Sequence, residues 1–175
     1  GAIMGTVQDI QANNGDVMAA FSSRGMNNQL PDLIKPDMTA PGVDILAAWG
    51  TDPLFTAPEY NIISGTSMSS PHMTGVGTLM MNAKYPAWTV AEIQSALMMT
   101  SLWDNTVRKE DGVTPTDPFD RGSGRVNLAN ALNAGLLLDI TQEEYDAANP
   151  ATGGDPRTLN YPSMADDACY HSCGW

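Results

Sequence analysis

Short apolar runs separated by turn-forming residues fill the first 65 positions. Residues 2–7 and 17–21 read as two strands around Asn13-Asn14-Gly15, because Asn-Gly supplies the positive φ angles that a tight hairpin turn needs. Residues 43–49 predict a buried strand, and residues 60–64 predict a further strand. We therefore expect short strands to dominate the first third of the chain.

The next run of apolar residues lacks strand alternation and predicts a buried helix over residues 67–83. Pro71 falls in the expected first turn, where proline suits a helix start. Gly75 and Gly77 each cost about 1 kcal/mol relative to alanine inside a helix. We therefore expect a neighbouring element to pack very closely against both glycines.

The second half of the chain carries capping signals for shorter helices. Residues 24–42, 104–120 and 150–157 are rich in proline, glycine or polar residues and predict irregular connections. Strands followed by helices indicate a layered α/β fold. The capping signals are Thr89 with Glu92 before a helix over 90–101, Asn127 before a short helix ended by Gly135, and Thr141 with Glu144 before a helix that stops ahead of Pro150.

Composition and charge narrow the class of protein. A chain of 175 residues with 42% apolar residues is long enough for one compact domain and too apolar for disorder. No apolar stretch approaches the 18–20 or so residues that a membrane span needs. The net charge of −12, without any Lys/Arg cluster, excludes nucleic-acid binding, which requires neutralised phosphates.

Two cysteines, Cys169 and Cys173, lie near the C-terminal end. They form no zinc-ligand pattern. Their spacing allows the Cα separation of roughly 4.4–6.8 Å that a disulfide needs, so we expect a disulfide if the protein is secreted. The chain begins at Gly1 without a signal-peptide pattern, which we interpret as an internal cut.

Ser67 has the sequence setting of a nucleophile. It follows a predicted strand and Gly65-Thr66 and opens a predicted helix, where free backbone amides and the helix dipole stabilise an oxyanion. The surrounding residues match neither the Gly-x-Ser-x-Gly elbow of α/β-hydrolases nor the Ser-x-x-Lys signature. Spacing alone leaves a simpler role open, since serine is also a preferred helix cap.

Four segments, in order, resemble subtilisin-like serine proteases, the subtilases. They cover about residues 15–138. The segment around Ser67 closely resembles the nucleophile motif of that family. The four segments are Phe21–Gly25 (FSSRG), Lys35–Ile45 (KPDMTAPGVDI), Gly65–Gly75 (GTSMSSPHMTG) and Gly122–Asn127 (GSGRVN).

The resemblance implies a serine endopeptidase that hydrolyses polypeptides. Ser67 would form the acyl-enzyme and its backbone amide half of the oxyanion hole, with Gly65, Thr66 and Met68 beside it. The aspartate, the histidine and the oxyanion asparagine of the family precede the matched region. They would come from an N-terminal remainder of the catalytic domain, so this chain alone is expected to be inactive. Secretion is also implied.

The resemblance also implies the fold and the domain boundaries. The expected fold class is α/β, namely the C-terminal portion of a three-layer subtilisin-like fold with a mainly parallel sheet flanked by helices. Residues 1–138 would belong to the catalytic domain and 139–158 to a helix and linker. Leu159–Ser163 (LNYPS) resembles the junction found in subtilases with a protease-associated insertion, so 159–175 would begin a fibronectin-like β domain.

Other polar residues have simpler interpretations. His72 lies about 140° around the helix from Ser67 and cannot act as its base; we expect it to be hydrogen-bonded inside the fold. His171 belongs to the tail, and Asp37 and Asp44 read as surface or turn carboxylates. No cofactor is assigned to this chain; calcium is a candidate for the parent protein, but this segment does not support it. The acidic Glu143, Glu144 and Asp146 lack a calcium-loop arrangement and predict a solvated face.

Two rival functions stay open at this point. The first is a non-catalytic binding or structural module derived from a subtilase half-domain. The second is a serine acyltransferase or esterase.

Overall fold

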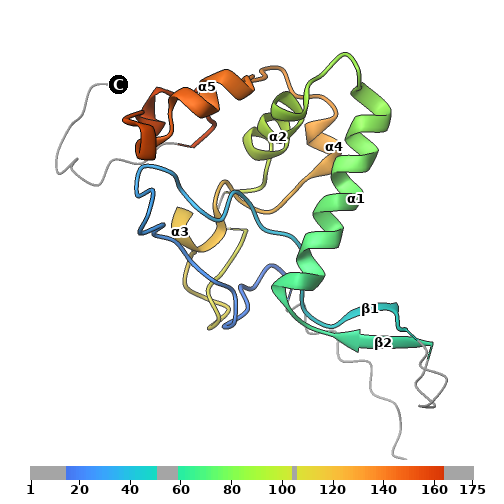
Figure 1. Ribbon diagram of the computed structural model, residues 1–175. Coiled ribbons are helices and arrows are strands. Elements are labelled where there is room, and N and C mark those ends of the chain that lie inside the picture. Colours follow the sequence, from blue (N-terminus) through green and yellow to red (C-terminus); the bar gives the residue numbers. More distant parts are fainter. Residues whose placement is uncertain (1–14, 51–58, 104–105, 164–175) are drawn as a thin grey trace, which may run out of the picture.

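The computed structural model describes residues 15–50, 59–103 and 106–163 (Figure 1). Helices and turns predominate, with one pair of strands. In chain order the elements are β1 (Ile45–Ala48), β2 (Tyr60–Ile63), α1 (Thr66–Lys84), α2 (Val90–Met99), α3 (Pro118–Arg121), α4 (Leu128–Ala131), α5 (Gln142–Ala147), η1 (Pro150–Thr152) and η2 (Pro156–Thr158).

Strands β1 and β2 form an antiparallel ribbon that projects from the start of α1 (Figure 1). Ile45 pairs with Ile63 at one end and Ala48 with Tyr60 at the other. Both strands were predicted, but the burial predicted for residues 43–49 is wrong, since Leu46 is 65% exposed. The face of the ribbon that carries Leu46 and Ile62 is open, whereas Ile45 and Ile63 on the other face are half-buried.

The mainly parallel, three-layer sheet expected from the resemblance is not seen in the described part of the chain. Its only named sheet is the antiparallel β1–β2 pair. The predicted strand at residues 17–21 is also wrong: Val17 makes a single parallel bridge with Arg108, and a turn follows, with Ser22 N donating to Ala19 O at 3.0 Å. The expected strand at 2–7 lies outside the described residues.

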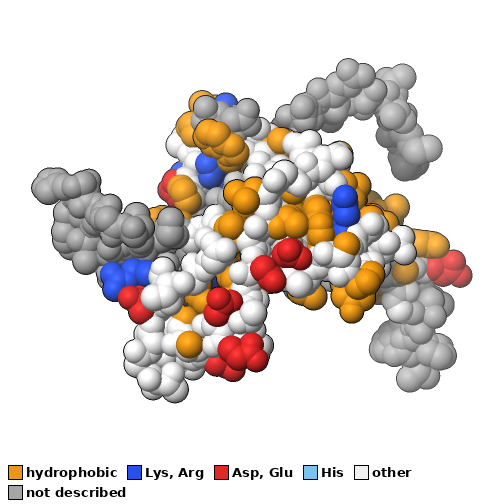
Figure 2. All heavy atoms as spheres, turned by 90° about the horizontal axis from the view of Figure 1, so that it is seen from above, with side chains coloured by type: hydrophobic (Ala, Val, Ile, Leu, Met, Phe, Trp, Pro, Cys, Tyr) orange, Lys and Arg blue, Asp and Glu red, His pale blue; other side chains and the backbone are white. Residues whose placement is uncertain are grey.

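Helix α1 agrees with the predicted helix in length but not in burial. Met80 is its only buried residue, and hydrophobic side chains lie open on the surface (Figure 2). A Cβ added to Gly75 or Gly77 would meet nothing within 4 Å, so the expected close packing is absent among the described residues. Pro71 lies in the second turn, not the first, because the helix begins at Thr66.

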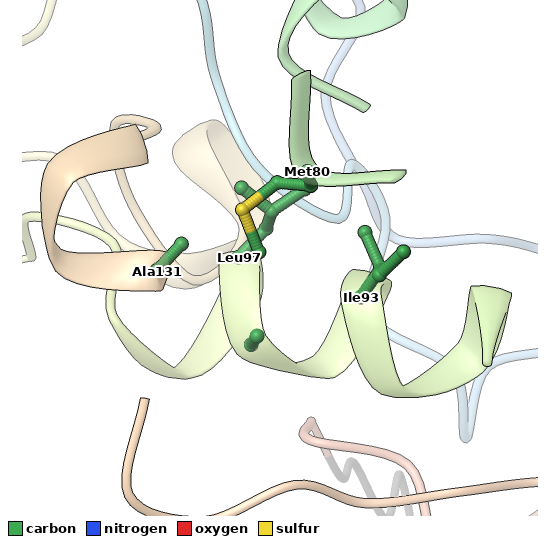
Figure 3. Packing of buried hydrophobic residues seen from close by; sticks show 5 residues of the cluster. Met80, Ile93, Leu97 and Ala131 are labelled. Atoms are coloured by element: carbon green, nitrogen blue, oxygen red, sulfur yellow. The ribbon is translucent and has the colours of Figure 1, made fainter. Parts of the chain in front are cut away.

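The main core joins α1, α2 and α4. Met80 from α1 lies against Ile93 and Leu97 of α2 and Ala131 of α4 (Figure 3). Met80, Ala96 and Ala131 are completely buried. The predicted capping box of α2 is confirmed: Glu92 N donates to Thr89 Oγ1 at 3.1 Å, and Thr89 N donates to Glu92 Oε2 at 2.7 Å.

A smaller cluster of Ile140, Ala148 and Leu159 holds the last described residues against the rest. The predicted capping box of α5 is present, with Thr141 N donating to Glu144 Oε2 at 2.7 Å. Asn127 also caps α4 as predicted, through a 3.2 Å bond from Asn130 N. None of the described helices is long and apolar enough to cross a membrane.

Helix α3 was not predicted, because residues 104–120 read as an irregular connection. Asp117 accepts bonds from the amides of Phe119 and Asp120, and Asp120 accepts from Asp117 N at 3.0 Å. The Asp120 carboxylate also lies 2.8 Å from Arg24 and 3.2 Å from Lys109. These ion pairs connect the N-terminal loop to the segment around α3.

Candidate active site

The predicted nucleophile lies at the beginning of α1. Ribbon strand β2 ends at Ile63, and Gly65 is the cap residue from which α1 starts. The Gly65 carbonyl accepts bonds from Met68 N at 3.0 Å and Ser69 N at 3.4 Å. Ser67 is the second residue of the helix and is exposed to solvent.

The backbone of Ser67 is free to bind an anion. Within the described residues, the amides of Thr66 and Ser67 have no hydrogen-bond acceptor, as expected in a first helical turn. The positive end of the α1 dipole adds to the same field. An oxyanion beside Ser67 would therefore find an unpaired N–H donor.

The described residues hold no base for the Ser67 hydroxyl. His72 is the only histidine among them, and its Nδ1 lies 2.8 Å from the carbonyl oxygen of Met68 one helical turn back. The expected hydrogen bond is present, but His72 is exposed and not inside the fold. His171, Cys169 and Cys173 lie outside the described residues.

An open hollow of about 920 Å³ adjoins the start of α1. Thr66, Ser69 and Met73 line it from the helix, and Phe21 and Met38 line it from the N-terminal segments. Ser67 itself is not among its lining residues. The hollow therefore borders the nucleophile turn on one side.

Residues 40–44 are hydrogen-bonded to residues 64–69, the turn that carries Ser67. Gly65 N donates to Gly42 O at 2.8 Å, and Asp44 N donates to the Ser64 hydroxyl at 2.8 Å. The Ser69 hydroxyl donates to the carbonyl of Ala40. These contacts were not predicted, since they join residues 20 or more positions apart.

Asp37 is more than the surface carboxylate that we expected. Its Oδ1 accepts a bond from the Tyr161 hydroxyl at 2.6 Å and lies 2.6 Å from Lys35 Nζ. Burial is the main reason that the pKa of Tyr161 is raised, and the hydrogen bond to Asp37 raises this pKa further. Gln94 donates to the same hydroxyl at 2.9 Å. No local sequence signal pairs positions 37 and 161.

The remaining acidic candidates agree with their predicted settings. Asp44 is an exposed turn residue with a φ of 52°. Glu143, Glu144 and Asp146 are exposed on α5, which confirms the solvated face. Over the described ranges, no group of three or more His, Cys, Asp or Glu residues is arranged to hold a metal ion.

Comparison with known proteins decides the family. Residues 3–134 match the profile described as "Subtilase family", and the site described above lies inside this stretch. The chain belongs to the subtilase family. The resemblance seen in the four sequence segments is thereby confirmed.

Among curated subtilases, the chain is similar to Subtilisin-like protease SBT1.6 from Arabidopsis thaliana, at 42% identity over 166 residues, or 87% of this chain and 21% of that protein. Subtilisin-like protease SBT1.7 is 43% identical over 82% of this chain and 20% of its own length. The Arabidopsis "CO(2)-response secreted protease" is 39% identical over 73% of the chain. This subtilase chain thus spans about a fifth of the relatives' length.

Among solved structures, the chain matches the crystal structure of fervidolysin from Fervidobacterium pennivorans, "a keratinolytic enzyme related to subtilisin". The match has a TM-score of 0.42 and 28% identity, and covers 57% of this chain and 15% of that one.

Proposed function

We propose that this chain is the C-terminal part of the catalytic domain of a subtilisin-like serine endopeptidase, with Ser67 as its nucleophile. The observation that carries the proposal is the exposed Ser67 at the start of α1, with an amide that has no acceptor among the described residues. It lies in the segment Gly65–Gly75, inside the family match.

In the proposed reaction, Ser67 Oγ attacks the carbonyl carbon of the scissile peptide bond. A histidine supplied from outside this chain removes the hydroxyl proton and then gives it to the leaving amine, while an aspartate orients that histidine. The amide of Ser67 donates to the oxyanion that forms on the carbonyl oxygen. Water then hydrolyses the acyl-enzyme, which releases the acid and restores the Ser67 hydroxyl.

Two open flanks of α1 support the proposal that further parts of the domain pack against this helix. Gly75 lies one turn before Leu79, and Gly77 one turn before Met81, and these two apolar side chains are 56% and 44% exposed. Glycine in a helix interior costs about 1 kcal/mol relative to alanine, and exposed apolar side chains gain nothing in water. Gly75 and Gly77 lie about 200° apart around the helix, so elements packed tightly on both flanks of α1 would account for both features.

Polypeptides are the proposed substrates, and the extracellular space is the proposed location. One relative carries the word "secreted" in its name, and secretion suits a candidate Cys169–Cys173 disulfide. The domain boundaries at residues 138 and 158 are part of the same proposal.

The test replaces Ser67 by alanine in the full-length protein that carries this chain. Peptide hydrolysis should fall by about 10⁶-fold, the loss found when subtilisin itself loses its nucleophile. Thr152→Ala is the matched control, because it removes one exposed hydroxyl on η1. Near-normal hydrolysis by Ser67→Ala would overturn the proposal and favour a non-catalytic module or another catalytic residue.

A further inference from the structure

We infer that Ser69 is a positioning residue for the Ser67 nucleophile, acting through a hydrogen bond to the backbone of residues 40–41. The inference rests on the proposed function of Ser67. Among the described residues, no hydrogen bond joins Ser69 to Ser67; the Ser69 hydroxyl instead fixes the first turn of α1 to residues 40–41.

The Ser69 side chain is fitted closely to the 40–42 segment. Its hydroxyl donates to the carbonyl of Ala40, and Ser69 Oγ lies 3.1 Å from the carbonyl oxygen of Pro41. A Cβ added to Gly42 would lie 3.0 Å from Ser69 Oγ and 2.8 Å from the carbonyl oxygen of Gly65. A larger residue at position 42 would therefore push the helix start away from this segment.

The nucleophile is held from both sides by this contact. Two residues before Ser67, the Gly65 amide donates to Gly42 O at 2.8 Å. Two residues after it, the Ser69 hydroxyl is bound to Ala40. Ser67 thus lies at the centre of a five-residue stretch whose two ends are fastened to the same segment.

Ser67 makes fewer helical hydrogen bonds of its own than a residue in the middle of α1. Its amide has no acceptor among the described residues. Pro71, four residues further along α1, has no N–H to donate to the Ser67 carbonyl. The bonds of Gly65 and Ser69 to the 40–42 segment therefore add to the Met68 N bond to Gly65 O in orienting the Ser67 amide and hydroxyl, and a small misplacement of either group slows acyl transfer.

The experiment compares Ser69→Ala with the unaltered full-length protein. It measures the rate constant for reaction with a fluorophosphonate, counted per titratable active site, together with kcat and KM for a peptide substrate. We expect the rate constant and kcat to fall three- to tenfold, the size of one net hydrogen bond, with KM within twofold. Gly42→Ala, which presses on the same contact, should lower both as well.

The control is again Thr152→Ala, which removes a 3.0 Å bond from a hydroxyl to a carbonyl on η1 and should leave every parameter within twofold. A Ser69→Ala rate constant within twofold of the unaltered value would overturn the inference. So would a smaller active fraction with an unchanged rate per active site, because that result means a purely structural role.

Ser67→Ala, measured in parallel, separates the two hypotheses. If Ser67→Ala takes no label while Ser69→Ala reacts normally, only the positioning role is wrong. If Ser67→Ala is still labelled at an active serine, the proposed nucleophile is wrong and the positioning role is overturned with it.

Discussion

Ser67 owes its setting partly to neighbours in sequence and partly to a segment more than 20 residues away. The strand, the Gly65 turn and the helix start follow from adjacent residues, and this part was predicted. The bonds from Gly65 to Gly42 and from Ser69 to Ala40 were not, because they arise only when the chain folds back. Sequence patterns therefore predict local geometry well, but they do not predict contacts between segments that are far apart in the sequence.

Met68 offers a test at the neighbouring residue. Its half-buried thioether lies beside Gly65, with Sδ 3.5 Å from the position of an added Cβ. Hydrogen peroxide should convert it to the larger, polar sulfoxide and slow peptide hydrolysis by the full-length protein several-fold. Met68→Leu should resist this loss. Unchanged turnover with sulfoxide mapped at Met68 would contradict the prediction.

The ion pairs of Asp120 make a contribution to stability that should depend on pH. Burial raises its pKa, but the Asp117 amide, the Lys109 hydrogen bond and the charges of Arg24 and Lys109 outweigh burial and hold the pKa below its usual value. Because this pKa is lower in the folded state than in the unfolded state, the Asp120 carboxylate stabilises the fold fully at pH values above its unfolded-state pKa of about 3.9. The stabilisation is lost as the pH falls through the folded-state pKa.

Asp120→Asn should therefore destabilise the protein at pH 7 by about 1–3 kcal/mol, and by less at pH 3. Melting temperatures of variant and unaltered protein at the two pH values measure the difference. Glu143→Gln, an exposed carboxylate on α5, is the control. An equal loss at both pH values would show that the Asp120 charge is not involved.

At the scale of elements, helix starts were more predictable than strand burial. Thr89, Asn127 and Thr141 cap the helices that their spacing indicated, because a cap depends on residues within three positions. Asp117 and Asp120 have the same spacing and cap α3, yet the surrounding polar and proline residues concealed it. Burial of the 43–49 strand depends on partners elsewhere, and sequence periodicity cannot supply them.

The open surface of helix α1 around Gly75 leads to a prediction about stability. Gly75→Ala meets no atom within 4 Å in the chain as described, so in the isolated 175-residue chain it should raise helix stability by up to about 1 kcal/mol. In the full-length protein, strands over α1 should collide with the added methyl and lower the melting temperature. Stabilisation of the same size in both proteins would mean that nothing packs on this side.

For the whole molecule, the helices that form the core of α1, α2 and α4 could be predicted from the sequence, whereas the arrangement of the sheet could not. The capped helices with their apolar stripes come together around Met80. The expected parallel sheet requires strands that the described residues do not contain. Ser67 likewise has no catalytic base among the described residues, because the proposed base belongs to a part of the protein outside this chain.

We propose that Ser67 is a nucleophile completed by residues outside this chain. The most direct measurement treats the full-length protein and the 175-residue chain with the same fluorophosphonate and locates the adduct by mass spectrometry. We predict one adduct on Ser67 in the full-length protein and none in the 175-residue chain. An adduct on another residue, or stoichiometric labelling of Ser67 in the 175-residue chain alone, would contradict it.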